Sequence, residues 1–316
     1  MKKAYVGFDT SNYTTSIAVC DEGGEIVANL KRPLPVKSGE CGLRQSDAVF
    51  AHIKNIPILA DELSVFLKEG RYTPAAVGVS ARPRDAEGSY MPCFLSGVSA
   101  AHSFAASSGI PVLDFSHQNG HVMAAAYSSG ASERLFTSEF LAFHVSGGTT
   151  EALLVRPNGV EFSCELVGET LDLNAGQVID RVGVMLGLDF PCGAALEKLA
   201  SEYVGKTKNV KISVNDCCCN LSGVENMAKK LLSDGADKTE VAAFVFDFIC
   251  RTLIKMASQI IEKYGRMPLL FAGGVMSNTY MREAISREFE AYFSAPSFSA
   301  DNAAGVALLC RKKALS

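Results

Sequence analysis

The stretch FLAFHVSGGTTEALLV, residues 140–155, decides the fold class of this chain. It consists of two apolar runs around a polar, glycine-containing turn, which is the pattern of a β-hairpin. Residues 4–30 have the same layout, because AYVGFD and TTSIAV flank a Thr/Ser-rich turn and EIVANL follows a Gly-Gly turn. The similarity of TTSIAV and TTEALLV, about 135 residues apart, indicates an internal duplication.

Helices and strands alternate after each of these hairpins. Helical spacing predicts helices over residues 46–70, 95–108, 171–186, 221–232, 238–264, 278–290 and 303–316. Pro57 predicts a kink in the first helix or its division into two. Further strands are expected at AAVGVSA, PVLDF, PLLFAGG and near Phe293. The repeated pattern predicts an α/β protein with lobes at 1–135 and 136–301 and a cleft between them. The final helix, 302–316, is expected to pack back on the first lobe.

Composition sets broad limits on the class of protein. The chain has 316 residues, of which 48% are hydrophobic and 20% charged, so it can build well-packed cores and is not a disordered chain. No run of about 18 apolar residues occurs and the apolar start is too short for a signal peptide, so we expect a cytoplasmic protein without membrane contact. The net charge of −4 predicts no broad basic surface, and any RNA contact would be local.

The ten cysteines do not form a short disulfide framework. In the cytoplasm they are expected to be reduced thiols. The run Cys217–Cys219 could bind a metal, but the chain has no C-x-x-C spacing and no second cluster. The plain interpretation of the run is three unpaired thiols.

Three turns follow apolar runs and are candidates for phosphate binding. They are DTSNYTTS (9–16), VSGGTTE (145–151) and AGGVMSN (272–278). Such turns leave backbone N–H groups open, and these groups hold anions. We therefore consider Ser11, Gly273 and Gly274 as contacts to a nucleotide. The alternative is that each is an ordinary turn, with Ser277 or Asn278 as a helix N-cap.

His117 and His121 are spaced four residues apart, so on a helix both imidazoles lie on one face and can share a metal ion. A zinc peptidase would need a glutamate beside the first histidine, but Gln118 occupies that position and cannot act as a base. Asp301 is the candidate third ligand, although an aspartate before the apolar helix AAGVALL is also a common N-cap. The pair itself could also be two capping or surface histidines.

The order of motifs along the chain resembles the TsaD family of tRNA threonylcarbamoyl transferases. The resemblance runs from end to end, and its most specific part is the long ungapped stretch 168–193. The motifs are GFDTSNYTTSIAV, AHIKNIPIL, SHQNGH, VSGGTTEALLV, GETLDLNAGQVIDRVGVMLGLDFPCG, LSGV, AGGVMSN and ADNAAG.

This resemblance implies the duplicated RNase-H-like fold of the actin-like ATPases, with a nucleotide between the lobes and a divalent metal beside its phosphates. It implies that His117, His121 and Asp301 bind this metal, for which iron, zinc and magnesium are the alternatives. It also implies contacts to an adenine nucleotide or threonylcarbamoyl-adenylate. These contacts are Val145, Ser146, Gly147, Gly148, Thr149, Asp180, Gly193 and Asn278, with Asp180 suited to a ribose hydroxyl.

The implied reaction transfers the threonylcarbamoyl group from its adenylate to N6 of the adenosine next to the anticodon of tRNA, releasing AMP. The implied partners are tRNA, an inactive TsaB-like paralogue and a small TsaE-like ATPase. A kinase or ATPase acting on another substrate, and the older metallopeptidase assignment, are the remaining alternatives.

Four departures from the family pattern fall at expected functional positions. Tyr13 and Thr14 stand where the family has an Asp-Glu pair, Thr149 replaces a histidine, and Glu225 replaces a lysine. The segment RPRDAEGSY, 82–90, replaces a Gly-Pro-Gly loop. Losing a cation where RNA would approach lowers affinity for it. The departures support a second hypothesis, a catalytically idle nucleotide-binding paralogue that acts as a subunit or regulator of such a complex.

Overall fold

The computed structural model describes residues 1–11, 13–35, 43–298 and 303–316. Clustering of the chain gives two compact units. The first contains Met1–Gly130, Pro157–Ser163 and Ser297–Ser316, and the second contains Ala131–Arg156 and Cys164–Pro296. The lobe boundaries and the cleft expected from the sequence stay predictions, and residues 301 and 302 lie outside the described part of the chain.

The first unit is built on a five-stranded sheet. Its strands are β1 (Lys2–Asp9), β2 (Thr14–Asp21), β3 (Ile26–Pro33), β4 (Tyr72–Arg82) and β5 (Val112–Ser116). The first three form the antiparallel meander that the sequence predicts, and β4 and β5 add parallel strands on the other side of β1. The resulting order is β3-β2-β1-β4-β5.

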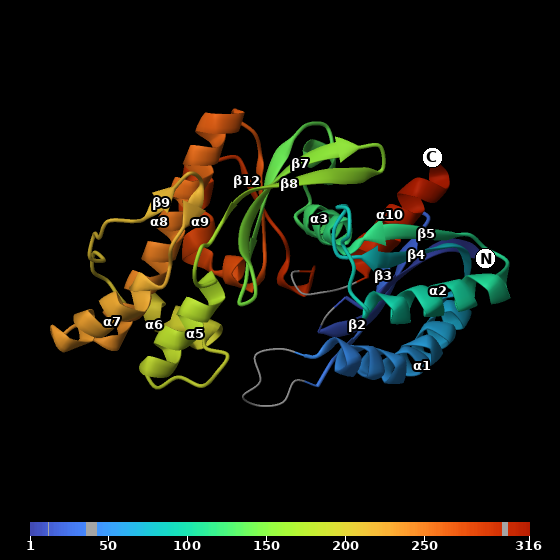
Figure 1. Cartoon of the computed structure of the whole chain (residues 1–316), viewed down its shortest axis with the longest axis horizontal. Coiled ribbons are helices and arrows are strands. Elements are labelled where there is room, and N and C mark those ends of the chain that lie inside the picture. The colour runs from blue at the N-terminus through green and yellow to red at the C-terminus, as the bar shows by residue number, and fades with distance from the viewer. Residues whose placement is uncertain (12, 36–42, 299–302) are drawn as a thin grey trace. The chain divides into compact units, whose positions relative to one another are not determined.

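Helices cover both faces of this sheet (Figure 1). The helices α1 (Gln45–Gly70) and α2 (Phe94–Ser108) pack on one face, where Val6 of β1 lies in their shared core. The other face carries α3 (His117–Ser128) and α10 (Ala304–Leu315). Gly7 allows α10 to approach closely, because an added Cβ would lie 2.6 Å from the backbone nitrogen of Ala307.

The helix α1 continues through Pro57 as a single element, so the alternative of two separate helices is wrong. Proline removes the hydrogen bond to the carbonyl of residue 53. Both Ile53 and Pro57 are exposed, so water can solvate this carbonyl and the helix need not end there.

The second unit repeats the first sheet. Its strands are β6 (Phe140–Val145), β7 (Thr150–Asn158), β8 (Glu161–Glu169), β11 (Leu269–Ala272) and β12 (Ala291–Phe293). They pair in the order β8-β7-β6-β11-β12, with β6, β11 and β12 parallel, which matches β3-β2-β1-β4-β5 strand for strand. The duplication predicted from TTSIAV and TTEALLV is therefore confirmed.

Five long or medium helices pack around this second sheet, and their apolar faces form one large core with β6, β7 and β11. They are α5 (Ala175–Met185), α6 (Gly193–Ser201), α7 (Gly223–Ser233), α8 (Lys238–Tyr264) and α9 (Thr279–Glu288). Short elements connect them: α4 (Ser132–Leu135), β9 (Val214–Asn215), β10 (Cys218–Cys219), η1 (Gly274–Ser277) and η2 (Pro296–Phe298). None of the helices in the described ranges is both long and apolar enough to cross a bilayer.

Candidate functional site

Asp9 ends β1 and is the centre of a buried polar cluster in the first unit. Its carboxylate, 1% exposed, accepts hydrogen bonds from the Ser11 backbone N–H (3.0 Å), the Ser80 hydroxyl and Nδ1 of His117 (2.8 Å). Burial alone would raise the pKa of this carboxyl, but the charge of His117 and the three hydrogen bonds outweigh it and hold the pKa below its usual value. The cluster therefore keeps a carboxylate in a buried position.

The topology explains why these residues meet. The strands β1, β4 and β5 are parallel neighbours, so their carboxyl ends lie at one edge of the sheet. Asp9, Ser80 and His117 come from these three ends, and ligands of open α/β sheets bind at such edges. The hydroxyl oxygen of Ser11 is buried there and has no hydrogen-bond partner within the described ranges, which suits contact with a polar ligand.

The predicted histidine pair lies in the first turns of α3, on one face of the helix as the four-residue spacing predicts. The rings of His117 and His121 are 4.2 Å apart between centroids and nearly perpendicular, with an interplanar angle of 79°. Ser116 caps the helix by accepting a hydrogen bond from the Asn119 backbone N–H. The nitrogen donors of both rings thus lie on one helix face beside the Asp9 cluster.

Of the three expected metal ligands, the described residues contain His117 and His121. Across the described ranges, no group of three or more His, Cys, Asp or Glu side chains is arranged to hold a metal ion. Asp301, the expected third ligand, lies outside the described residues. Two imidazoles on one helix face, one of them bonded to a carboxylate, fit the donor chemistry of a divalent cation.

The segment 82–90, where the chain departs from the family, is tied to the same helix. Asp85 accepts hydrogen bonds from the Ser116 hydroxyl and the Asn119 side-chain amide, both at 2.6 Å. Asn119, 1% exposed, in turn accepts from the backbone N–H of Phe162 (2.6 Å) and donates to its carbonyl (3.1 Å). Asp85 and Asn119 therefore join this segment and the tip of the β7–β8 hairpin to the start of α3.

The turn between β6 and β7 is the glycine turn of the second unit that the sequence predicts to bind phosphate. The hydroxyl of Ser146 accepts hydrogen bonds from the backbone N–H groups of Gly148 (3.2 Å) and Thr149 (3.1 Å). Gly147 and Gly148 are exposed, and a Cβ on either would meet no atom within 4 Å. Gly176, at the start of α5, donates to the Ser146 carbonyl at 3.1 Å, so a helix N-terminus adjoins the turn.

A second glycine turn lies beside the first, because β6 and β11 are parallel neighbours. Gly273 has φ of 99° and packs on Val145, whereas Gly274 is exposed with open space around it. Asn278 is the N-cap of α9, as the sequence suggested, and its side chain accepts from the Met281 backbone N–H at 2.9 Å. Its contact to a nucleotide stays a prediction.

Asp180 bonds to Cys192, the residue before Gly193 at the start of α6. One carboxylate oxygen of Asp180 accepts from the Cys192 backbone N–H at 2.8 Å, which fixes the side chain at the surface of α5. No hydrogen bond occupies its other oxygen within the described ranges. That oxygen is the chemically suitable acceptor for a hydroxyl group of a ligand.

Asp172 is an important residue that sequence reasoning missed. It accepts hydrogen bonds from the backbone N–H groups of Leu173 (2.6 Å), Leu221 (2.7 Å) and Ser222 (3.2 Å), and from the Ser222 hydroxyl (2.6 Å). Burial opposes ionisation, but these bonds lower its pKa to about 2. Asp172 thus holds the LSGV motif against the 168–193 stretch. No local signal in the sequence pointed to this, because the helix predicted over residues 171–186 included Asp172.

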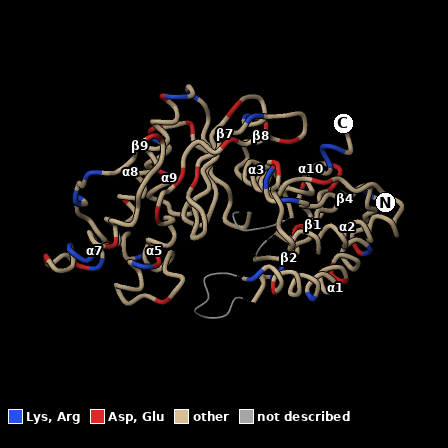
Figure 2. Tube along the Cα trace, viewed as in Figure 1, with Lys and Arg blue, Asp and Glu red and all other residues tan. Residues whose placement is uncertain are grey.

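The positions that depart from the family pattern are solvent-accessible. Tyr13 is 41% exposed, and Glu225 forms ion pairs with Lys229 (2.7 Å) and Arg181 (3.5 Å). Figure 2 shows Lys and Arg interspersed with Asp and Glu along the trace of the described residues. The local RNA contact expected from the composition stays a prediction.

The cysteine run does not resemble a metal centre. Cys217 and Cys219 are buried and burial raises the pKa of both thiols, that of Cys219 to about 11. The nine cysteines of the described ranges form no disulfide.

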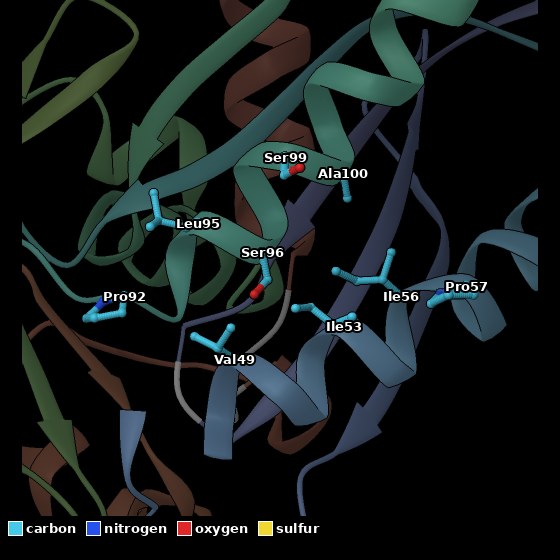
Figure 3. A pocket seen from close by; sticks show the side chains of 9 residues that line it. All are labelled: Val49, Ile53, Ile56, Pro57, Pro92, Leu95, Ser96, Ser99 and Ala100. Atoms are coloured by element: carbon cyan, nitrogen blue, oxygen red, sulfur yellow. The ribbon is translucent and has the colours of Figure 1, made fainter. Parts of the chain in front are cut away.

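Two hollows of about 510 and 570 Å³ lie between α1 and α2. Figure 3 shows Val49 and Ile53 of α1 facing Ser96 of α2 across the first hollow. No charged side chain lines it, and its walls are mostly apolar.

Comparisons with known proteins identify the family of this chain. The TsaD model, described as tRNA N6-adenosine threonylcarbamoyltransferase, matches residues 42–308. The protein of that name from Enterococcus faecalis is 28% identical over 90% of this chain and 80% of its own length. Its namesake from Thermotoga neapolitana is 27% identical over 98% and 94%.

Solved structures share the fold at low identity. Component A of (R)-2-hydroxyglutaryl-CoA dehydratase from Acidaminococcus fermentans superposes with a TM-score of 0.54 and 16% identity over 99% of both chains. HypF of T. kodakarensis superposes with a TM-score of 0.60 and 12% identity over 99% of this chain and 47% of its own. The fold is that of the actin-like ATPases, and the chain belongs to the TsaD family.

Proposed function

We propose that this protein transfers the threonylcarbamoyl group from threonylcarbamoyl-adenylate to N6 of the adenosine next to the anticodon of tRNA. The observation that carries the proposal is the match of the TsaD model across residues 42–308. The Asp9–His117–His121 cluster of the first unit and the two neighbouring glycine turns of the second unit support it, because they supply the donor types that a divalent cation and an acyl-adenylate require.

The second unit would bind the adenylate. The exposed turns at Gly147 and Gly274, where an added Cβ would meet no atom within 4 Å, leave room for its phosphate, and the second oxygen of Asp180 suits a ribose hydroxyl. In the reaction, the N6 amine attacks the carbamoyl carbonyl and forms a C–N bond. The C–O bond to the phosphate breaks, AMP leaves with the electron pair, and one proton passes to solvent.

In the first unit, His117 and His121 would hold a divalent cation, with Asp301 as third ligand. When bound, the cation supplies Lewis-acid stabilisation of negative charge on the adenylate. Iron and zinc suit two imidazoles and a carboxylate, and magnesium is the third alternative. In cells we expect a cytoplasmic protein working with a TsaB-like paralogue and a small TsaE-like ATPase.

A second candidate function is a catalytically idle nucleotide-binding subunit or regulator of such a complex. Glu225 favours it, because this carboxylate and its two ion pairs stand where the family pattern has a lysine. Tyr13 favours it also, since an exposed phenol occupies a position of the family's Asp-Glu pair.

The test incubates metal-loaded protein with synthetic threonylcarbamoyl-adenylate and unmodified tRNA, and detects modified adenosine by mass spectrometry. We expect product with the wild type, none with His117→Ala, and wild-type yield with His102→Ala, an exposed histidine of α2 used as the matched control. Adenylate binding without product, with and without partner proteins, would reject the transferase in favour of the idle subunit.

A further inference from the structure

The hydrogen bond between Asp9 and His117 defines which ring nitrogen carries a proton. Nδ1 of His117 lies 2.8 Å from Oδ2 of Asp9, and a carboxylate can only accept a hydrogen bond. The proton is therefore on Nδ1. A neutral imidazole with its proton on Nδ1 has its lone pair on Nε2, and that lone pair is what binds a metal.

The carboxylate of Asp9 is itself held rigidly. The Ser11 backbone N–H binds Oδ1, and the Ser80 hydroxyl binds Oδ2 from the neighbouring strand. Asp9 is 1% exposed, so water does not compete for these positions. A buried carboxylate held by these two hydrogen bonds can in turn fix the plane of the imidazole bonded to it.

We infer that Asp9 is a positioning residue that holds the proton on Nδ1 of His117 and so presents Nε2 to a divalent cation shared with His121. The inference rests on the metal site of the proposed function. Asp9 does not touch the cation in this role, and it acts through the histidine. Carboxylate–histidine–metal triads work in this way, and loss of the carboxylate typically lowers metal affinity by about 10- to 100-fold.

The substitution Asp9→Asn separates this role from simple space filling. If the amide oxygen takes the place of Oδ1, the NH₂ group faces Nδ1 of His117 and favours the opposite tautomer. If the oxygen takes the place of Oδ2, the NH₂ group faces the N–H of Ser11, donor against donor. The geometry at Ser11 thus favours the orientation that gives the wrong tautomer.

Two measurements test the inference. Long-range ¹H–¹⁵N NMR of the metal-free protein above pH 8 reports the tautomer, and we expect the His117 proton on Nδ1 in the wild type and on Nε2 in Asp9→Asn. Competition with a chromophoric chelator reports Zn²⁺ affinity, which we expect to fall about 10- to 100-fold in Asp9→Asn and to recover in part in Asp9→Glu. A changed d–d spectrum of bound Co²⁺ should accompany the loss.

Asp85→Asn is the matched control, because Asp85 bonds to the start of the same helix without contacting either histidine. It should change Zn²⁺ affinity by less than about threefold. An equal loss of Zn²⁺ affinity in both variants would show that the effect comes from displacement of α3, and it would overturn the inference. A wild-type proton on Nε2, or unchanged Zn²⁺ affinity in Asp9→Asn, would also overturn it. Failure of the wild type to bind Zn²⁺ would remove the metal site itself, whatever the transferase assay shows.

Discussion

The substitution of glycine by alanine is expected to have very different effects at two adjacent positions, Gly273 and Gly274. Gly273 has φ of 99° and ψ of 154°, a region open essentially only to glycine. An alanine Cβ there would collide with the carbonyl oxygen of Val145 and lie 2.6 Å from its carbonyl carbon. Gly274 has no heavy atom within 4 Å of the same added atom.

The expected loss of unfolding free energy in Gly273→Ala has two contributions, backbone strain and overpacking. Backbone strain at Gly273→Ala costs about 1–3 kcal/mol. Overpacking adds about 1–3 kcal/mol, because the obstructing atoms are backbone atoms of β6, which is paired on both sides and cannot shift alone. We therefore expect Gly273→Ala to lose about 2–6 kcal/mol of unfolding free energy, and Gly274→Ala less than about 0.5 kcal/mol.

Urea unfolding followed by circular dichroism measures the difference, with the transition midpoint compared at constant slope. Threonylcarbamoyl-adenylate binding by calorimetry should weaken in Gly273→Ala, because displacing Val145 moves the 146–149 turn. Equal midpoints for the two variants would refute the argument from close backbone approach.

The remaining predictions concern three polar side chains. Asp172→Ala should lose about 1–3 kcal/mol at pH 7, because Leu221 loses its hydrogen-bond acceptor. The folded-state pKa of Asp172 is lowered to about 2, so its stabilisation is complete above the unfolded pKa and is lost as pH falls towards 2. Urea midpoints from pH 7 down to pH 2 should therefore converge for wild type and variant, and a constant gap would contradict this. Glu225→Lys should increase the retention of tRNA on filters at low salt. It should also steepen the slope of the logarithm of the binding constant against the logarithm of salt concentration by about one. Unchanged retention would argue against RNA at this position. Asn119→Ala removes both hydrogen bonds to the Phe162 backbone, and hydrogen exchange at that amide should accelerate; equal exchange rates would show that the hairpin tip is held otherwise.

Much of the fold was predictable from local pattern. The helix α8 runs over Lys238–Tyr264 as its spacing predicts, since Asp237 caps its start and Gly265 follows its end. The meander and the repeated sheet followed from alternating apolar runs. Boundaries were less predictable. The helix expected from Leu171 begins only at Ala175, because Asn174 and Gln177 form a capping box.

The candidate site was predictable in part, for a definable reason. The four-residue spacing of His117 and His121 is local, so the sequence alone places both imidazoles on one helix face. Asp9 and Ser80 could not be paired with His117 in this way, since Asp9 is 108 residues away from it along the chain. The sequence marked Asp9 only as a polar residue that follows an apolar run, which does not identify its partners.

The sequence by itself determined the family, the duplicated α/β plan, the histidine spacing and the glycine turns, because these depend on periodicity and on residue chemistry within a few positions. Tertiary structure decided which of these groups meet. Parallel pairing of β1, β4 and β5 gathers Asp9, Ser80 and His117 at one sheet edge, since strand ends separated along the chain become neighbours only when the sheet forms.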